Sequence, residues 1–344
     1  MSQRIDVTAS HEWDEVVAGS DGELFLSRRW IGVLEEVFDL NMEAIIQRDA
    51  GGRIVGALPF CCVDDVRSSR VAVLPFSDFV TPVLHADADW DHVIDPILQL
   101  GRPLVFQTTG GSPAATDERF VQDGESVRHS VALDADLDEL MSRFSQHHRR
   151  LVRKSAKHGL RFRLAESTDE LRAFYELHLG VRKHKYGMLA QPYRLFEALW
   201  EEFLTKGAGG LVLGFDGSMV VGGCLLLEAG DTLYYKYAAS HPDYRALGVS
   251  HGATVQAMEL GLQRGLAKLD LGRSDLDQPG LVDFKRRFGA TATALHRYRS
   301  KDQLFQEVSE MDRLLTDLTG LMTQSTVPDH ITERAGDRLY RLFA

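Results

Sequence analysis

Two short segments of the chain repeat one pattern, and this repetition limits the folds that the chain can adopt. Residues 45–58 (IIQRDAGGRIVGAL) and 211–224 (LVLGFDGSMVVGGC) each consist of two apolar runs joined by a turn that contains Asp and Gly. Such a turn between two strand-like runs is a strong signal for a β-hairpin. Each second run also carries Val-Gly near its start, and glycine within a strand often marks a bulge or a close backbone contact. The repeat predicts two halves of similar construction.

The segments around the two hairpins support this interpretation. Residues 10–15 and 167–171 resemble capped helix starts, and amphipathic helices are expected over 30–38 and 193–203. Each half is therefore expected to run helix, helix, hairpin and further strand, although such successions also occur in unrelated folds. In the second half, a strand over 232–238, a helix over 251–264 and a strand over 268–272 follow. The sequence predicts an α/β chain with two domains, each a mixed twisted sheet flanked by helices.

Length, composition and charge narrow the class of protein. The 344 residues suggest about two domains, and 44% hydrophobic with 26% charged residues is a globular composition. The first residues are polar, and the sequence lacks the roughly 18 uninterrupted apolar residues of a membrane span. Three cysteines, two of them adjacent, favour a reducing compartment. We expect a cytoplasmic protein without membrane insertion. The net charge of −11 argues against DNA binding and leaves RNA contact to a local basic patch.

Such a patch lies between the two halves. Residues 141–165 contain eight Arg or Lys residues and no acid, and Gly159 fits the end of a helix that precedes a strand over 160–164. One interpretation is a solvated connecting helix. The other is a clamp for phosphate or for an RNA backbone. In the second interpretation the contacting residues are Arg149, Arg150, Arg153, Lys154 and Lys157.

Two features of the second half suggest a ligand site. In the strand over 232–238, strict alternation places Tyr235 and Tyr237 on one face and Lys236 on the other, where they either line a cleft or belong to the core. The following loop, 244–250 (YRALGVS), opens a helix and resembles the acyl-CoA pyrophosphate loop of GNAT (Gcn5-related N-acyltransferase) enzymes. Arg245 and Gly248 match that pattern, whereas Ser250 stands where Gly or Ala is expected. Backbone N–H groups at a helix start bind phosphate, although a plain loop is the alternative.

A more specific motif follows at residues 280–289 (GLVDFKRRFG). Together with 270–274 (DLGRS), 234–240 (YYKYAAS), the basic run at 149–159 and 74–82 (LPFSDFVTP), it resembles the Fem-type aminoacyltransferases and related GNAT-like acyltransferases. The resemblance extends over about residues 13–300 and is stronger in the second half. The second half of the sequence shows no long two-helix arm such as some Fem enzymes carry.

The resemblance implies a tandem GNAT-like fold whose reacting groups lie mainly in the second domain. The expected division is a first domain over 1–140, a basic interdomain helix over 141–159, a second domain over 160–300 and a helical tail over 301–344. It also implies that an amino acid from charged tRNA, or an acyl group from CoA, is joined to an amine. The acceptor would be a small molecule or a peptidoglycan precursor. No tightly bound cofactor and no metal are expected.

The chemistry of this transfer indicates which residues to look for. A neutral amine attacks an ester or thioester, and positive charge or N–H groups must stabilise the oxyanion that develops. In Fem-type enzymes the lysine of this motif, here Lys285, is linked to catalysis; the other interpretation is a solvated basic helix start. A proton acceptor is also needed. Asp275, Asp270 and Asp78 are the candidates, with Asp270 favoured as structural.

Further side chains are expected to bind substrate. A cationic cluster around Arg182 could hold a phosphate or carboxylate of the acceptor, although solvated charge is equally consistent with it. The expected substrate-binding residues are Asp78, Arg182, Tyr235, Lys236, Tyr237, Arg273 and Arg286. The main hypothesis is aminoacyl transfer from charged tRNA. The alternatives are an acyl-CoA-dependent N-acetyltransferase of polysaccharide or natural-product biosynthesis and a GNAT-shaped binding protein without turnover.

Overall fold

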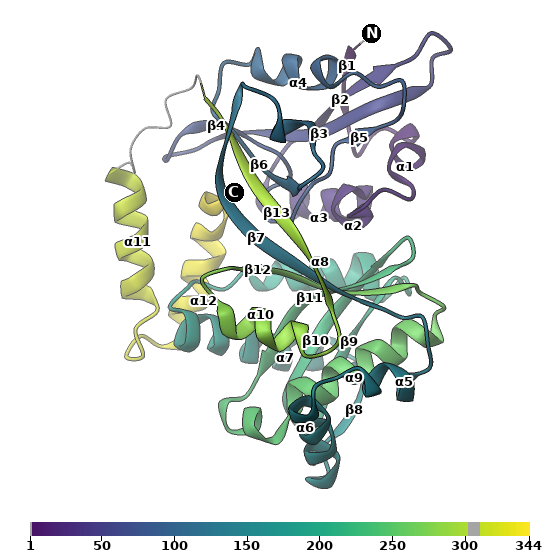
Figure 1. Cartoon of the computed structure of the whole chain (residues 1–344). Coiled ribbons are helices and arrows are strands. Elements are labelled where there is room, and N and C mark those ends of the chain that lie inside the picture. The colour runs from purple at the N-terminus through teal and green to yellow at the C-terminus, as the bar shows by residue number, and fades with distance from the viewer. Residues whose placement is uncertain (1, 302–309) are drawn as a thin grey trace. The chain divides into compact units, whose positions relative to one another are not determined.

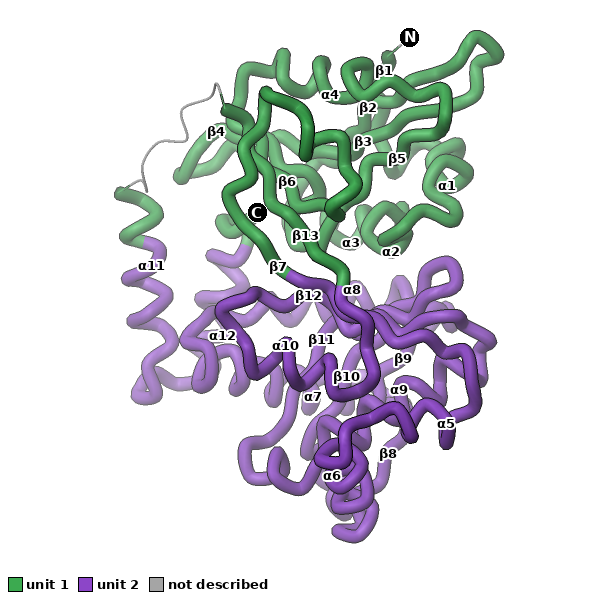
Figure 2. The backbone as a smooth tube through the Cα atoms, viewed as in Figure 1, with its two compact units in different colours: residues 1–126, 293–314, 341–344 green, residues 127–292, 315–340 purple. Residues whose placement is uncertain are grey.

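The computed structural model describes residues 2–301 and 310–344, and these residues form two compact units. Unit 1 comprises residues 1–126, 293–314 and 341–344, and unit 2 comprises residues 127–292 and 315–340 (Figure 2). Each unit thus combines separate stretches of the chain. The limits differ from the expected division, because residues 127–140 belong to unit 2 and residues 293–300 to unit 1.

The chain enters unit 1 first and passes into unit 2 along one long strand (Figure 1). The elements up to that strand are β1 (Ser2–Asp6), α1 (Glu12–Val17), α2 (Glu23–Leu26), α3 (Arg28–Phe38), β2 (Met42–Arg48), β3 (Ile54–Asp64), β4 (Ser69–Ala72), β5 (Val83–Leu84), α4 (Trp90–Leu98), β6 (Leu104–Thr109), a 3₁₀ turn (Pro113–Ala115) and β7 (Phe120–Ala132).

The remaining elements build unit 2 and then return to unit 1. They are α5 (Leu137–Ser142), α6 (Gln146–Lys157), β8 (Arg161–Leu164), α7 (Thr168–Gly180), a π-helical turn (Val181–Lys185), α8 (Tyr193–Leu199), a second π-helical turn (Trp200–Leu204), β9 (Gly209–Asp216), β10 (Met219–Ala229), β11 (Thr232–Ser240), a 3₁₀ turn (Pro242–Leu247), α9 (Val249–Gln263), β12 (Lys268–Asp275), α10 (Pro279–Arg286), β13 (Thr291–Ser300), α11 (Glu310–Met322), α12 (Asp329–Leu339) and a 3₁₀ turn (Tyr340–Phe343).

Unit 1 is built on a mixed sheet in the order β1-β2-β3-β4-β6-β13, with β5 added to β3. Neighbouring strands are antiparallel except for β4 and β6, which are parallel. The apolar residues of α3 recur every three or four positions and so form one apolar side of the helix. Trp30, Leu34 and Phe38 of this side are all buried. The Trp30 indole donates to Ser77 Oγ at 2.9 Å, so this buried polar group is satisfied.

Unit 2 is also built on a mixed sheet, in the order β8-β9-β10-β11-β12-β7. Strands β8 to β11 are antiparallel, whereas β11 and β12 are parallel. Helix α9 lies on the face that carries Cys224 and Leu226, because Cys224 Sγ reaches the Ala253 carbonyl and both residues belong to the core around α9. Helices α7 and α8 pack on the opposite face, against Tyr237. This arrangement confirms the predicted fold class.

The repeated sequence pattern is confirmed as two hairpins, β2–β3 in unit 1 and β9–β10 in unit 2. Glycines with positive φ close their turns, at +84° for Gly52 and +60° for Gly217. The capped start of α7 is also confirmed, since Ser167 Oγ accepts from the Glu170 N–H. The expected helical tail over 301–344 is seen as α11 and α12, and its residues 302–309 lie outside the described residues. Among the described helices, none combines the length and the apolar character of a membrane span.

Candidate functional site

The motif lysine, Lys285, lies in α10 and is buried, with 8% of its surface exposed. Its ammonium donates to the backbone carbonyls of Gly272 at 2.9 Å and Arg273 at 2.8 Å. Successive carbonyls of a regular strand point in opposite directions, but Gly272 has a φ of +74° and turns β12 so that both approach one ammonium. Lys285 is therefore a fixed, buried cation. Its neighbour Arg286 is 71% exposed in its side chain and pairs with Asp283 at 2.9 Å.

The backbone next to this lysine has an unusual feature. Strands β11 and β12 pair only through Thr232–Tyr234 and Lys268–Asp270, although β11 continues to Ser240 and β12 to Asp275. Parallel strands that stop pairing leave backbone N–H and C=O groups that need other partners. Beyond that point in β12, the Gly272 and Arg273 carbonyls accept from Lys285. The lysine thus lies beside the part of unit 2 where two neighbouring strands cease to form a ladder.

The aromatic strand β11 contains a bulge that the sequence did not reveal. Leu225 pairs with Tyr237 and Leu226 with Tyr235, so Lys236 is an extra residue on β11. Such a bulge breaks the alternation of side chains. Tyr235 packs with the α9 core, whereas Tyr237 contacts His178 and Phe196 with ring centroids 5.6 and 4.9 Å apart. The prediction that Tyr235 and Tyr237 share one face was therefore wrong.

The three candidate carboxylates lie in different surroundings. Asp270 is buried, accepts from Arg128 Nε at 2.6 Å and from the Gly272 N–H at 2.6 Å, and so has the structural position that was favoured for it. Asp275 ends β12, is partly exposed and pairs with Arg273. Asp78 lies in unit 1, where its backbone carbonyl accepts from Gln107 Nε2 at 2.5 Å. Unit 2 thus brings Asp275 and Arg273 onto the same strand whose carbonyls hold Lys285.

Helix α6 carries the predicted basic patch, and its cations have two kinds of surroundings. Arg149 donates to the Ser142 and Phe144 carbonyls at 2.6 and 2.7 Å, and Lys154 donates to the Ala246 carbonyl at 2.8 Å. The other three, Arg150, Arg153 and Lys157, are exposed and lie on one side of the helix at positions i, i+3 and i+7. None of these five cations forms an ion pair with a carboxylate of the described residues. We call Arg150, Arg153 and Lys157 the α6 stripe.

The predicted phosphate loop leads into α9 and packs against α6. Gly248 caps the helix with a φ of +85°, and a Cβ atom placed there would lie 2.3 Å from the Leu151 carbonyl oxygen of α6. This close approach explains why glycine is needed. Arg245 is exposed, and Ser250 is partly exposed in the first turn of α9. The loop and α6 therefore form one surface of unit 2.

The cluster around Arg182 lies in the π-helical turn after α7. Arg182 Nε donates to the Leu189 carbonyl at 3.1 Å. Its neighbour Lys183 has a buried side chain that pairs with Asp329 of α12 at 2.7 Å. Part of this cluster therefore ties α12 to α7. π-helical turns are often found at functional sites, which keeps Arg182 a candidate.

Sequence reasoning assigned no role to several buried histidines of unit 2. Burial lowers the pKa of His129 and His178 to about 4 and that of His251 to about 3, and it also lowers the pKa of His148. These imidazoles are neutral at pH 7. One signal in the sequence pointed to the burial of His148. It follows the apolar Phe144 by four residues, and this spacing places both side chains on the side that faces the core.

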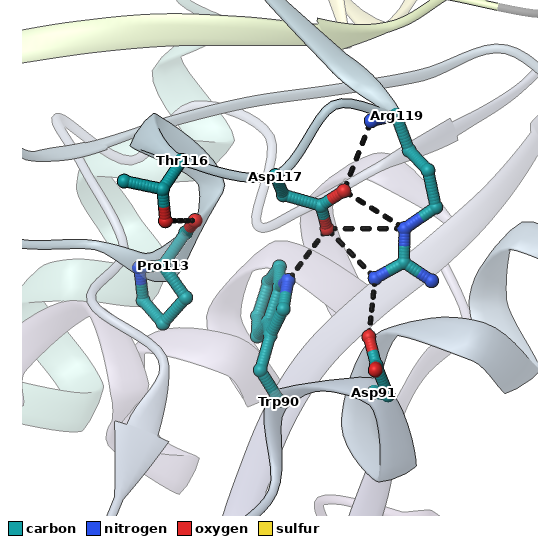
Figure 3. A pocket seen from close by; sticks show the side chains of 6 residues that line it. All are labelled: Trp90, Asp91, Pro113, Thr116, Asp117 and Arg119. Atoms are coloured by element: carbon teal, nitrogen blue, oxygen red, sulfur yellow. Dashed lines mark hydrogen bonds and ion pairs between the residues drawn. The ribbon is translucent and has the colours of Figure 1, made fainter.

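A pocket of about 380 Å³ lies in unit 1 and is shown in Figure 3. It is lined by Trp90, Asp91, Pro113, Thr116, Asp117 and Arg119. Asp117 accepts from the Trp90 indole at 2.8 Å and from Arg119 at 2.7 Å, and Arg119 also reaches Asp91 at 2.5 Å. The polar groups of the pocket thus satisfy one another, and none of them is a predicted site residue.

Possible metal ligands and the thiols complete the description of reactive side chains. The described part of the chain contains no group of three or more His, Cys, Asp or Glu side chains that could hold a metal ion. Burial raises the pKa of the Cys61 thiol to about 12 and raises that of Cys224 further. Both thiols therefore stay protonated and are poor nucleophiles.

Comparisons with known proteins agree with this geometry. Residues 142–286, which include α6, the α9 loop and Lys285, match the family described as acetyltransferase (GNAT) domain. The fold is similar to that of FemX, with a TM-score of 0.63 and 15% identity over 92% of this chain and 99% of FemX. It is also similar to a tandem GNAT protein from the clavulanic acid biosynthesis pathway, with a TM-score of 0.57 and 12% identity over 89% and 99% of the two chains.

A third similar structure is L-PGS from Bacillus licheniformis, with a TM-score of 0.56 and 13% identity over 89% of this chain and 98% of that one. A comparison with curated protein sequences finds no match. The family match and the shared fold confirm the resemblance drawn from the motifs. Residues 142–286 thus match the acetyltransferase (GNAT) domain family, and the chain as a whole has the fold of FemX and of a tandem GNAT protein.

Proposed function

We propose that this protein transfers an aminoacyl group from aminoacyl-tRNA to an amine of a cell-wall precursor or a small molecule. In this reaction the amine attacks the ester carbonyl carbon, an amide bond forms, and the ester oxygen leaves with the tRNA. The observation that carries the proposal is the joint occurrence in unit 2 of a buried cation, Lys285, and an exposed α6 stripe.

Lys285 is suited to stabilise the oxyanion of this reaction. Two backbone carbonyls already fix its ammonium, so little reorganisation is needed when negative charge develops nearby. Because the lysine is buried, its charge acts in a medium of lower effective dielectric constant than water. Asp275 is the proposed proton acceptor, and Arg273 beside it would orient it. The proposed acceptor contacts in unit 2 are Arg182, Lys236, Tyr237 and Arg286. The roles of Tyr235 and of Asp78, which lies in unit 1, stay predictions from the sequence.

The α6 stripe is the reason for preferring tRNA as the donor. Its three exposed cations extend over eight residues, or roughly 10 Å of helix. Lys154 of the same helix donates to the loop that precedes α9. A polyanion gains affinity from such a stripe by releasing counterions. Arg149 and Lys154 would act indirectly, because they already bind backbone carbonyls of α5, of the segment between α5 and α6, and of the loop before α9.

A second candidate donor is acyl-CoA, and two observations favour it. Residues 142–286 match a family named for acetyltransferases. In addition, α9 begins at Gly248, and Arg245 and Ser250 are accessible near its first N–H groups, which is a suitable arrangement for a pyrophosphate. Calorimetric titration with acetyl-CoA separates the two donors. Tight binding of acetyl-CoA would favour the second candidate and refute the first.

The tRNA proposal is tested by the salt dependence of binding. We would measure the affinity of bulk charged tRNA between 50 and 200 mM salt for the parent protein and for R150A/R153A/K157A. Removing three phosphate contacts should make the slope of log K against log salt less negative by about 2 to 3. The matched control is R338A, an exposed cation of unit 2 outside the stripe and without a proposed role. A flat salt response of the parent protein would refute the proposal.

The role of Lys285 is tested by K285A. We expect turnover to fall about a hundredfold or more, the usual cost of removing a group that stabilises an oxyanion. Circular dichroism and denaturant unfolding would show whether unit 2 remains folded, and K285R would test whether a cation alone suffices. Near-normal turnover of K285A would show that the lysine has no catalytic part. Ligand binding without product from either donor would indicate a binding protein.

A further inference from the structure

His148 lies on the inner side of α6 and makes a specific contact with the segment that carries Lys285. It is 2% exposed, and its Nε2 atom lies 3.0 Å from the backbone carbonyl oxygen of Phe284. A carbonyl can only accept a hydrogen bond, so Nε2 must carry the proton. Phe284 immediately precedes Lys285 in α10. One hydrogen bond therefore connects α6 to the backbone next to the candidate catalytic lysine.

The imidazole ring also meets aromatic rings from two other helices. Its centroid lies 4.5 Å from that of Phe288, just after α10, and 4.4 Å from that of His251 in the first turn of α9. The Phe284 ring is 5.4 Å away. Thus one buried ring touches α9 close to the predicted donor loop and α10 on both sides of Lys285. Such packed aromatic contacts resist sliding of one helix past another.

Other contacts hold α6 against the same two elements. The Ser145 N–H donates to the Arg287 carbonyl at 2.9 Å, which joins the start of α6 to the end of α10. Lys154 donates to the Ala246 carbonyl at 2.8 Å, and Gly248 lies against the Leu151 carbonyl. These two contacts join the middle of α6 to the donor loop. Helix α6 is therefore held by α10 at its start and by the loop before α9 farther along.

We infer that His148 is a positioning residue that holds Lys285 in register with α6 and the α9 loop. The inference rests on the proposed function, in which Lys285 stabilises charge and the α6 stripe binds the donor. A phenylalanine would fill the same aromatic cluster without the cost of burying an imidazole, whose Nδ1 atom has no hydrogen-bond partner among the described residues. What histidine adds over phenylalanine is the Nε2–H bond to Phe284.

Two variants separate the hydrogen bond from the packing. H148F keeps an aromatic ring and removes the N–H donor, whereas H148Q keeps an N–H donor near the Nε2 position and removes the ring. The control is H158Q, at an exposed histidine at the end of α6. Hydrogen–deuterium exchange of the peptide covering residues 279–289 should speed up in H148F and stay close to the parent rate in H148Q. No change in H148F, or equal changes in both variants, would overturn the inference.

Turnover provides the second readout, with bulk charged tRNA and a lysine-containing peptidoglycan-precursor pentapeptide as probes. In H148F we expect kcat to fall about ten- to a hundredfold, because small misplacements of a reacting group have effects of that size. The KM for charged tRNA should change less than twofold, and H148Q should recover most of the kcat. In a K285A background, H148F should have no further effect. An undiminished effect in that background would overturn the inference.

The two proposals fail in different ways. If K285A retains turnover, the proposed role of Lys285 is wrong, and hydrogen exchange of residues 279–289 still decides whether His148 holds α10. If K285A is inactive while H148F is fully active, the proposed function stands and the positioning role of His148 is wrong. An NMR spectrum of the histidine ring nitrogens gives a further check, since neutral His148 should appear as the Nε2–H tautomer.

Discussion

The contact between Gly248 and α6 allows a quantitative test of how unit 2 is assembled. In G248A the new Cβ atom would lie 2.3 Å from the Leu151 carbonyl oxygen, and the residue would keep a φ of +85°. The left-handed backbone costs an L-residue about 1–2 kcal/mol, and overpacking against a fixed backbone adds about 1–3 kcal/mol. We therefore expect unit 2 to lose roughly 2–5 kcal/mol of unfolding free energy.

A matched control lies at the other end of the same helix. Gly265 follows α9 with a φ of +69°, and a Cβ atom there would meet no atom within 4 Å. G265A should therefore show the backbone penalty alone, about 1–2 kcal/mol. Urea unfolding followed by tryptophan fluorescence would measure both variants, because Trp200 reports on unit 2 and the other three tryptophans report on unit 1. Equal losses in G248A and G265A would refute the close packing of α6 on the α9 loop.

G248A should also change function if α6 and the loop act as one surface. Displacing α6 by a few tenths of an ångström would move the α6 stripe relative to the start of α9. We expect weaker binding of bulk charged tRNA in G248A than in G265A at the same salt concentration. Loss of stability without any loss of binding would mean that the donor does not use this surface.

Three further predictions follow from buried groups. Burial and the nearby His148 hold the pKa of His251 at about 3, below its ordinary value of 6.5. Between these two pH values the unfolded chain binds more protons, so stability falls as the pH falls. At pH 5 the loss is about 2 kcal/mol, and urea unfolding of H251F should not show this loss. D270N should cost about 3–5 kcal/mol because Arg128 keeps a buried charge, and a D270N protein of parent stability would refute the buried pair. In the native protein a thiol reagent should modify Cys62, which is partly exposed, and spare Cys224, as peptide mass spectrometry would show.

Local signals in the sequence predicted much of the fold. Asp-Gly turns, the Ser167 cap and Gly159 at the end of α6 act through neighbouring residues, so their effects can be recognised without knowledge of the rest of the chain. The motif at 280–289 pointed to Lys285 for the same reason, since its residues are contiguous. The strand–helix order of the second half was sufficient to predict an α/β fold.

The surroundings of the candidate site could not be predicted in this way. The bulge at Lys236 depends on the register between β10 and β11. Because of this bulge, Tyr235 and Tyr237 lie on opposite faces of the sheet. Likewise, sequence could not tell whether Asp270 was a base or a structural acid, because its partner Arg128 is 142 positions away.

The amino-acid sequence by itself determined the elements of this protein, its turns and the identity of its motif lysine, because these depend on contacts between residues close in the chain. Only the tertiary structure decided that Lys285 is buried against the carbonyls of β12 and that His148 joins α6 to α10, the helix of Lys285. Burial and hydrogen bonding between distant segments arise from packing, and packing is set by all the surrounding elements together.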